Sequence, residues 1–448
     1  MARLVVIGGG AAGMSAASAA RRTAPDLEVV VCEVGGFAAY GMCGIPYYLS
    51  GVIADPQTLL AYPPAEFRDR RGIDLRLHTR VTGIDPAAHQ IRVAGPQDGP
   101  DAGGAPLGYD ALVLATGADP VLPPVPGLSH PRVVTVRSLD AAIGLRGVLE
   151  RGQIRRAVVV GAGYIGLEMA EALTERGIET EVIEALPTVL GTVDEPIARL
   201  AADEVTRHAG LRLSTRLEAV HADDDGLAVL AGGTRTRADL LVVATGVAPS
   251  TGLLTTAGAD HLPGGALITG PDMATSLPDV FAAGDCAALH HIVLGGPAWV
   301  PLGPAANKTG RVAGTVAAGG AATFGGIAGT AVVKVFDTEV ARTGLTLAEA
   351  RAAGLDAVAT DVVSRSRAKY YPGSVPLHVR LVHERGGRLL GGQLAGREGA
   401  ATRVDVLAAA LHARASVADL AAMDLAYAPP FAPVYDPLLT AAIKAGAR

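Results

Sequence analysis

Two glycine-rich stretches decide the fold of this chain: LVVIGGGAAG at residues 4–13 and AVVVGAGYIG at residues 157–166. Each has four apolar residues, then the pattern G-x-G-x-x-G, then residues that suit a helix. This order predicts a strand, a tight turn and a helix. The first glycine permits the turn, the second lets the backbone approach a pyrophosphate, and the third lets the helix pack on the strand. The pyrophosphate would lie at the helix N-terminus, where free N–H groups favour anions.

A carboxylate completes each pattern. The apolar runs EVVVCE at residues 28–33 and EVIE at 181–184 end in Glu33 and Glu184, about 20–25 residues beyond the first glycine, where a carboxylate binds a ribose diol. The chain is therefore predicted to bind two dinucleotides. The residues expected to contact them here are Gly8, Gly10, Ala11, Ala12, Gly13 and Glu33 in the first site, and Gly161, Gly163, Tyr164, Ile165, Gly166 and Glu184 in the second.

The layout of domains follows from a second repeat. LVLATG at residues 112–117 and LVVATG at 241–246 read as buried strands ending in small-residue turns, where the chain crosses between nucleotide domains. We expect Ala115, Thr116, Gly117 and Gly246 to contribute to the nucleotide sites. The Pro-rich run at residues 120–126 fits a linker.

The predicted fold is α/β, with two Rossmann-like dinucleotide-binding domains, one inserted in the other, and an α+β C-terminal domain. The expected boundaries are 1–117 and 248–325 for the first domain, 118–247 for the second and 326–448 for the third. In the third, strands are expected at 332–336, 377–383 and 389–394, with helices starting at Thr346 and Val404.

Bulk properties exclude several classes of protein. A net charge of −6 over 448 residues gives no basic footprint for nucleic acid. The uncharged stretches 240–259, 287–307 and 312–333 are interrupted by Gly, Pro, Ser or Thr, which disfavours membrane spans. No targeting segment is visible, and three cysteines without a C-x-x-C pair indicate neither disulfides nor a zinc ribbon. We expect a cytoplasmic protein. The adjacent His290 and His291 have no accompanying carboxylates, so no metal site is predicted.

One cysteine stands out from the other two. Cys43 lies in YGMCGIPY at residues 40–47, an irregular loop bounded by Gly and Pro, whereas Cys32 and Cys286 read as small buried hydrophobes. The loop is expected to open a helix, and that position lowers a thiol pKa. Cys43 is thus the cysteine expected to be reactive.

The order of these parts resembles the pyridine-nucleotide disulfide oxidoreductase family over the whole chain. The resemblance implies that the first glycine motif binds FAD, that the second binds NAD(P)H, and that Asp285, after Gly284 in the strand VFAAGD, binds the ribityl chain of the flavin. It also implies a homodimer formed by the C-terminal domain. The single cysteine is similar to the single-cysteine branch, and YGMCGIPY, YYPG at 370–373 and YAPP at 427–430 are most like coenzyme A disulfide reductases.

The resemblance also implies site residues. Cys43 would form a mixed disulfide with a substrate thiol, and electrons passing from NAD(P)H through FAD would release that thiol. Tyr427 and Tyr371 would reach the cysteine of the partner subunit, with the choice between Tyr370 and Tyr371 open. Coenzyme A, or another small thiol or disulfide, would contact Ser15, Arg22, Met42, Arg71 and Asn307. The competing interpretations are interface packing for the tyrosines, a solvated face for the arginines and helix capping for Asn307.

Some alternatives stay open at this point. Ala11 stands where related peroxidases carry a histidine, which disfavours peroxide chemistry. The rivals are an NADH oxidase that works through a Cys43 sulfenate, and a flavin-bearing redox sensor. Glu184 favours NADH over NADPH because it would repel a 2′-phosphate. No rhodanese-like domain is expected, since the sequence ends at Arg448.

Overall fold

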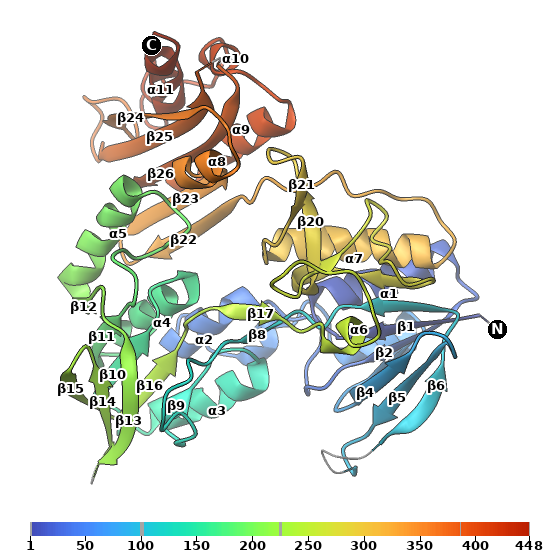
Figure 1. Cartoon of the computed structure of the whole chain (residues 1–448). Helices are drawn as coiled ribbons and strands as arrows, with labels where there is room; N and C mark the ends of the chain where they lie inside the picture. The colour runs from blue at the N-terminus through green and yellow to red at the C-terminus, as the bar shows by residue number, and fades with distance from the viewer. Residues whose placement is uncertain (1, 99–102, 224–225, 386, 448) are drawn as a thin grey trace.

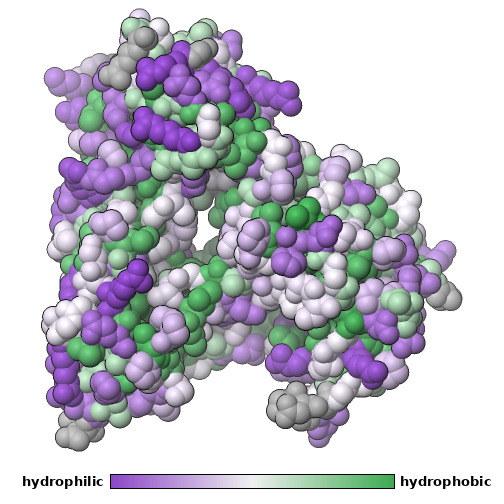
Figure 2. Space-filling model, viewed as in Figure 1, coloured by the Kyte–Doolittle hydropathy of each residue, from purple (hydrophilic) through white to green (hydrophobic). Residues whose placement is uncertain are grey.

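The computed structural model describes residues 2–98, 103–223, 226–385 and 387–447. The chain forms three bodies, each built on a five-stranded sheet, and the second body lies between two segments of the first along the chain (Figure 1). In that view the C-terminal body stacks on the second body, while the first lies to one side. The space-filling view is hollowed between the first body and this column (Figure 2). None of the helices among the described residues is long and apolar enough to cross a membrane.

The first sheet is parallel and joins distant parts of the chain. Its order is β19 (Val280–Ala282), β7 (Ala111–Leu114), β1 (Arg3–Ile7), β2 (Glu28–Cys32) and β3 (Ile73–Arg76). Because β19 pairs with β7, residues after the second glycine motif complete the sheet that begins at residue 3. The antiparallel strands β4 (Arg80–Asp85), β5 (Gln90–Ala94) and β6 (Ala105–Gly108) form a separate small sheet.

Two helices of the first body pack unusually closely. They are α1 (Ala11–Thr23) and α7 (Gly303–Ala317). A Cβ added at Gly310 would lie 2.1 Å from the carbonyl oxygen of Ala12, and one at Gly314 would lie 2.0 Å from that of Ala16. Glycine is therefore required at both positions of α7, and the two helices form one rigid unit beside the sheet.

The second sheet repeats the first. Its order is β12 (Gly210–Arg212), β11 (Glu179–Ile183), β10 (Arg156–Val160), β16 (Leu240–Val243) and β9 (Val133–Val134), all parallel. The helices of this body are α3 (Leu139–Glu150), α4 (Tyr164–Glu175) and α5 (Glu195–His208). An antiparallel sheet of β13 (Leu217–Asp223), β14 (Gly226–Ala231) and β15 (Thr234–Ala238) lies next to it.

The chain crosses between these bodies through a two-stranded sheet of β8 (Ala118–Pro120) and β17 (Val247–Pro249). Two threonines fasten it reciprocally. The Thr116 hydroxyl donates to the Ser250 carbonyl, and the Thr245 hydroxyl donates to the Val121 carbonyl, both at 2.6 Å. The start of the Pro-rich run is thus a paired strand, which corrects the expectation that the whole run is a linker.

The third sheet is antiparallel, in the order β22 (Ala331–Val335), β23 (Thr338–Gly344), β26 (Leu389–Gly396), β25 (Pro376–Glu384) and β24 (Ala357–Arg365). The three predicted strands are present, but β23 and β24 were missed. Its helices are α8 (Leu347–Ala352), α9 (Ala400–His412), α10 (Val417–Ala421) and α11 (Pro437–Gly446). Thr346 caps α8 as expected, whereas α9 begins before Val404, at Ala400.

Ionic contacts join this third body to the second. Glu171 on α4 accepts hydrogen bonds from the backbone N–H of Phe336 and from Lys334. Asp194, which precedes α5, accepts from Arg380 and Gln393. Buried carboxylates are stable only when they are paired in this way. These contacts therefore fix the third body against the second.

The shorter elements complete the chain. They are η1 (Met42–Gly44), α2 (Ile45–Ser50), η2 (Pro56–Leu59), η3 (Glu66–Arg70), α6 (Gly252–Thr255), β18 (Leu267–Ile268), η4 (Gly284–Cys286), β20 (Ala287–His291) and β21 (Gly296–Ala298). Of these, η1 and α2 carry the segment around Cys43, and η4 carries Asp285.

Candidate functional site

The first glycine loop, between β1 and α1, has the geometry of a nucleotide cradle. Gly8 has a φ of +103°, and a Cβ there would lie 2.3 Å from the Ala115 carbonyl oxygen. A Cβ at Gly13 would lie 1.9 Å from the Gly8 carbonyl oxygen. Gly10 differs, because no atom of the residues that the structure describes lies within 4 Å of the place its Cβ would occupy. The chain itself requires the first and third glycines, whereas the middle one leaves room for a ligand.

The second loop, between β10 and α4, repeats this geometry. Gly161 has a φ of +102°, and its Cβ would lie 2.3 Å from the Ala244 carbonyl oxygen. A Cβ at Gly166 would lie 1.9 Å from the Gly161 carbonyl oxygen, and the position at Gly163 is open. The agreement supports one use for both loops, which is the binding of a pyrophosphate at a helix N-terminus.

Both predicted ribose carboxylates lie beside their loops. Glu33 accepts hydrogen bonds at 2.6 Å from the backbone N–H groups of Gly9 and Gly35. Glu184 accepts from Ala162 at 2.7 Å and Leu186 at 2.8 Å. Each carboxylate oxygen has a further lone pair. Both carboxylates are therefore held in place and can still accept from a ribose hydroxyl.

The other predicted nucleotide residues lie around these loops. Ala11 and Ala12 begin α1, and Tyr164 and Ile165 begin α4. Ala115, Thr116 and Gly117 follow β7, and Gly246 follows β16. At all of these points the carboxyl ends of parallel strands meet helix N-termini, the edge of such sheets where ligands bind.

Asp285 on η4 faces a cation that sequence reasoning missed. Desolvation raises the pKa of the Asp285 carboxyl, and Arg137 opposes that rise. The Nε of Arg137 is buried and has no hydrogen-bond partner among the described residues, and its Nη1 lies 3.4 Å from the sulfur of Met42. A buried donor without a partner is costly unless a ligand satisfies it. Asp285, Arg137 and the open cradle at Gly10 are thus suited to an anionic dinucleotide such as FAD.

Cys43 lies in η1, directly before α2, and is exposed. Its sulfur is nevertheless partly enclosed, and desolvation, Glu168 and Asp285 together raise the pKa of the thiol above its ordinary value. The expectation of a lowered pKa is therefore wrong, because desolvation of the thiol and then the charges of Glu168 and Asp285 disfavour the thiolate. Cys32 and Cys286 are buried, and desolvation raises the pKa of each to about 11, which fits inert core residues.

Glu168 is a second residue that the sequence did not reveal. It lies on α4, in the helix that follows the second glycine loop, and lines a small cavity with Pro46, Tyr47 and Ser50 of α2. Desolvation and the charge of Glu171 raise the pKa of Glu168 to about 7. A carboxyl that titrates near neutrality next to a thiol can carry protons, and its only sequence signal is its place just after the third glycine.

Four of the residues predicted to bind a thiol substrate lie around α1. Ser15 donates a 2.9 Å hydrogen bond to the side chain of Asn307 on α7. Asn307 is therefore not a helix cap, since α7 begins at Gly303. Arg22 is exposed on the same helix as Ser15, and Arg71 reaches Ser18 of that helix at 3.4 Å. Met42 lies apart, beside Arg137.

Arg71 is held in place by aromatic rings. Its guanidinium carbon lies 4.1 Å from the ring centroid of Tyr62 and 4.9 Å from that of Phe67. Glu66 lies 3.5 Å away. Stacking on rings is a property of arginine that suits oriented binding of phosphate. The guanidinium is therefore oriented before any anion binds, although Glu66 balances part of its charge.

The structure bears on the choice between Tyr370 and Tyr371 that the sequence left open. The hydroxyl of Tyr427 lies 3.3 Å from that of Tyr370, and not beside Tyr371. All three are exposed on the C-terminal body. The α2 segment lies in a different body, below the centre of Figure 1. The pair is thus available to a partner molecule.

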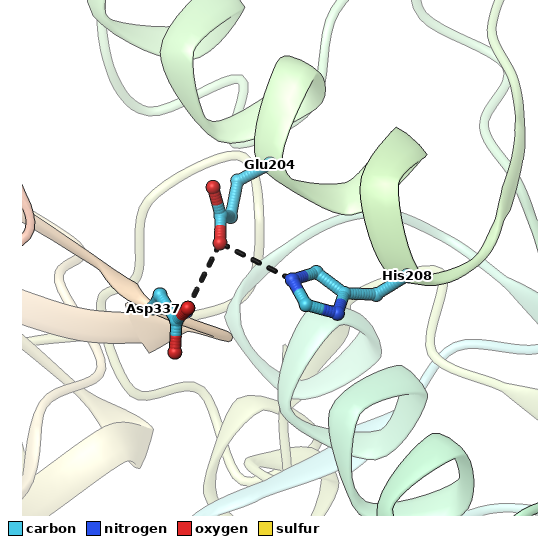
Figure 3. Close-up of side chains that lie close together, drawn as sticks. All are labelled: Glu204, His208 and Asp337. Carbon is cyan, nitrogen blue, oxygen red and sulfur yellow. Dashed lines mark hydrogen bonds and ion pairs between the residues drawn. The ribbon is translucent and has the colours of Figure 1, made fainter.

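A cluster of possible metal ligands joins the second and third bodies. Figure 3 shows Glu204 and His208 of α5 with Asp337, which lies in the turn between β22 and β23. Glu204 is buried and accepts hydrogen bonds from the Asp337 N–H at 3.2 Å and from His208 at 3.3 Å, and it pairs with Arg207. Although burial acts to raise the pKa of Glu204, these contacts hold it below its ordinary value. Its role is structural, since cationic and N–H partners already occupy it.

The adjacent His290 and His291 were not expected to bind a metal. His291 is buried, and desolvation lowers its pKa to about 4.

Two dinucleotide cradles and one exposed cysteine define an oxidoreductase that transfers electrons between a pyridine nucleotide and sulfur. Family models agree: residues 2–319 match pyridine nucleotide-disulphide oxidoreductase, and residues 330–437 match the dimerisation domain of these enzymes. The chain belongs to the pyridine nucleotide-disulphide oxidoreductase family, whose members use FAD and NAD(P)H.

Individual relatives share the full length of the chain. The NAD(P)H coenzyme A polysulfide/persulfide reductase of Pyrococcus horikoshii is 37% identical over 98% of this chain and 97% of its own length. An NADH oxidase of Methanocaldococcus jannaschii is 33% identical over 98% of each chain. The crystal structure of reduced Bacillus anthracis CoADR-RHD superposes with a TM-score of 0.94 at 30% identity, over 99% of this chain and 80% of the other.

Proposed function

We propose that this protein uses FAD and NAD(P)H to reduce coenzyme A disulfide, or a related small disulfide or persulfide, through a mixed disulfide on Cys43. The observation that carries the proposal is the position of Cys43. It is the exposed cysteine of the three, and both Glu168, from the helix after the second glycine loop, and Asp285, from the end of the first sheet, act on its thiol. The relatives named for coenzyme A and persulfide chemistry support the substrate class.

The chemical step at Cys43 is thiol–disulfide exchange. The thiolate attacks one sulfur of the substrate, a Cys43–substrate S–S bond forms, the substrate S–S bond breaks, and the second thiol leaves with a proton. Bound FAD supplies the means of accepting a hydride from NAD(P)H and delivering two electrons to this mixed disulfide. Those two electrons break the new bond and give back the Cys43 thiolate and a second substrate thiol. The net reaction consumes one NAD(P)H, one proton and one disulfide.

The chain's own groups determine where each cofactor would bind. Gly10, Glu33, Arg137 and Asp285 would hold FAD, and Gly163 and Glu184 would hold the pyridine nucleotide. Glu184 supports a preference for NADH, because a carboxylate at the ribose repels a 2′-phosphate. We further propose the domain boundaries 1–117, 118–247, 248–325 and 326–448, which follow the crossings at β8 and β17.

The substrate would lie along α1. Ser15, Arg22, Arg71 and Asn307 offer hydroxyl, amide and guanidinium groups around that helix, and Arg71 is already oriented by Tyr62 and Phe67. Guanidinium groups suit the phosphates of coenzyme A. Met42 would contact the thiol end, since it adjoins Cys43.

We propose a homodimer formed through the C-terminal domain, which matches the dimerisation model. In it, the exposed Tyr370–Tyr427 pair would reach the Cys43 of the partner and donate a proton to the leaving thiolate. A free, exposed thiol persists in a reducing compartment, which supports a cytoplasmic location.

The test is intact mass spectrometry of the purified FAD-loaded protein before and after NADH, with Cys43→Ser as the matched variant. The expected result is a thiol adduct on the wild type that NADH removes and that the variant lacks. The variant should lose disulfide reduction but still reduce a one-electron dye with NADH. A bare thiol with rapid oxygen uptake would overturn the proposal.

An NADH oxidase is the second candidate, favoured by the Methanocaldococcus jannaschii relative. In that reaction the Cys43 thiolate would be oxidised to a sulfenate by oxygen-derived peroxide. Ala11 leaves the first glycine loop without a histidine to assist such chemistry. Oxygen consumption that exceeds disulfide reduction at equal NADH would decide for this candidate. A redox sensor would instead show full NADH turnover in Cys43→Ser with every acceptor.

A further inference from the structure

The helix that follows Cys43 belongs physically to the second body. Although α2 lies early in the chain, its buried residues Ile45, Tyr48 and Leu49 are part of the apolar cluster of the second body, and not of the cluster beneath the first sheet. The same cluster includes Leu139 and Leu145 of α3 and Leu167 and Leu173 of α4, and α2 packs against both of these helices. Removing three large apolar side chains from water stabilises this packing. The cysteine segment is thus docked on the domain that carries the second glycine loop.

Two arginines fix the C-terminal end of this helix. The last carbonyl groups of a helix have no partner within it and need donors from elsewhere. The Tyr47 carbonyl accepts from the backbone N–H of Ile53 at 3.0 Å. The Tyr48 carbonyl accepts from Arg146 of α3, and the Leu49 carbonyl accepts from Arg176, which follows α4. Each of these two carbonyl groups is therefore satisfied by a different element of the second body.

The two guanidinium groups converge on one point. A Cβ at Gly51, the residue that ends α2 with a φ of +105°, would lie 3.7 Å from a nitrogen of Arg176 and 3.8 Å from one of Arg146. Desolvation and the neighbouring charge of Arg146 lower the pKa of Arg176. Two partly buried like charges so close together are unfavourable unless both have acceptors. Glu150 balances Arg146 at 2.6 Å, and the helix carbonyls supply the rest.

We propose that Arg146 and Arg176 are positioning residues for Cys43, which hold the cysteine segment against the second body. The inference rests on the proposed role of Cys43 in disulfide exchange. The nucleotide loop at Gly163 starts α4, and Arg176 ends it, so one helix connects the second cradle with the anchor of α2. The relative placement of the sulfur and the nucleotide site is then set by these two side chains together with the apolar face of α2, and not by the loop around Cys43.

The proposal separates two activities of one enzyme. Reduction of a dye by NADH needs the two nucleotides but not Cys43, whereas disulfide reduction needs the sulfur at a defined place. A misplacement of about 1 Å costs roughly a hundredfold in rate. The double variant Arg146→Met with Arg176→Met should therefore keep dye reduction within about twofold while disulfide kcat falls by roughly ten- to hundredfold.

The experiment measures both activities on FAD-loaded protein, with melting temperature recorded for each variant. The control is Arg151→Met, an exposed arginine just beyond α3 that is not one of the donors to α2. Arg146→Lys with Arg176→Lys tests rescue, since lysine keeps one donor and the charge. Equal losses of dye and disulfide reduction, or no loss of either, would overturn the proposal. If Cys43→Ser retains disulfide reduction, the proposed function fails instead, and the two failures are distinct.

Discussion

Glu33 and Glu184 occupy equivalent positions in two separate nucleotide sites. Each accepts one hydrogen bond from the backbone N–H of the residue after the first glycine of its loop. Each accepts a second from the residue two places after the glutamate itself. The backbone thus aims both carboxylates in the same way, although the two sites would hold different nucleotides.

This equivalence gives the first prediction. Glu184→Ala should lower kcat/KM for NADH by about tenfold or more, because a hydrogen bond to a charged acceptor contributes about 1.5–3 kcal/mol. NADPH should lose little, since its 2′-phosphate is no longer repelled. Steady-state kinetics with both nucleotides measures the ratio. Glu33→Ala is the matched control: it should weaken the binding of FAD, and with FAD added in excess its NADH/NADPH ratio should equal that of the wild type. An unchanged NADH/NADPH ratio in Glu184→Ala contradicts the assignment.

Two glycines of the second loop, Gly163 and Gly166, should respond differently to substitution by alanine. Gly163→Ala should leave the melting temperature nearly unchanged and raise the KM for NADH, because its Cβ enters open space that a pyrophosphate needs. Gly166→Ala should lower stability, because its Cβ would lie 1.9 Å from the Gly161 carbonyl oxygen. Thermal unfolding and kinetics on both variants test this contrast. Equal destabilisation by both substitutions argues against a ligand cradle.

The pH dependence of Cys43 reactivity should reveal Glu168. Because the pKa of Glu168 is raised to about 7, it is largely neutral below that pH and charged above it. Only its charged form raises the pKa of the Cys43 thiol. Glu168→Gln should therefore speed alkylation of Cys43 by iodoacetamide above pH 7 and have little effect below pH 6. Glu175→Gln, on the same helix, is the control. A rate that is the same for both variants at pH 8 would show that the two groups do not interact.

The raised pKa of Glu168 also makes the stability of the protein depend on pH. A folded-state pKa raised above the unfolded value means that Glu168 contributes most to stability below its unfolded pKa, and that this contribution is lost as pH rises towards 7. Glu168→Gln should flatten the dependence of the unfolding free energy on pH between about 4.5 and 7. Denaturant unfolding at several pH values measures this slope. An unaltered slope would assign the dependence to other groups.

The tyrosine pair allows a test of the C-terminal body. Tyr370→Phe and Tyr427→Phe each remove one end of the same hydrogen bond. Their effects on disulfide kcat should therefore be similar and non-additive in the double variant. Tyr371→Phe should change kcat little. Additive effects, or a larger effect at Tyr371, would favour Tyr371 instead of Tyr370.

Local constraints are what the sequence could reveal. The roles of Gly8 and Gly13 follow from short-range backbone geometry, so both loops and both carboxylates were predictable. Arg137 and Glu168 were not, because they reach the first body from the inserted one, and nothing in their own neighbourhood marks that contact. The pKa of Cys43 was mispredicted for the same reason, since the helix start is local, whereas the burial of the thiol and the charges of Glu168 and Asp285 depend on tertiary structure. Asn307 was placed near a helix start, yet α7 begins a full turn earlier.

The packing of α2 has a consequence for how the protein is made. The cysteine segment leaves the ribosome within the first fifty residues, but its apolar face is buried by α3 and α4, which are synthesised about 100 residues later. Domains generally fold as units during synthesis, and N-terminal ones fold first. The first body therefore cannot complete its fold until these helices and β19, at the edge of its own sheet, have been synthesised. A nascent chain stopped before Glu175 would expose Ile45, Tyr48 and Leu49 together with an unpositioned thiol, so this interval is the one in which the chain most needs protection from aggregation and oxidation.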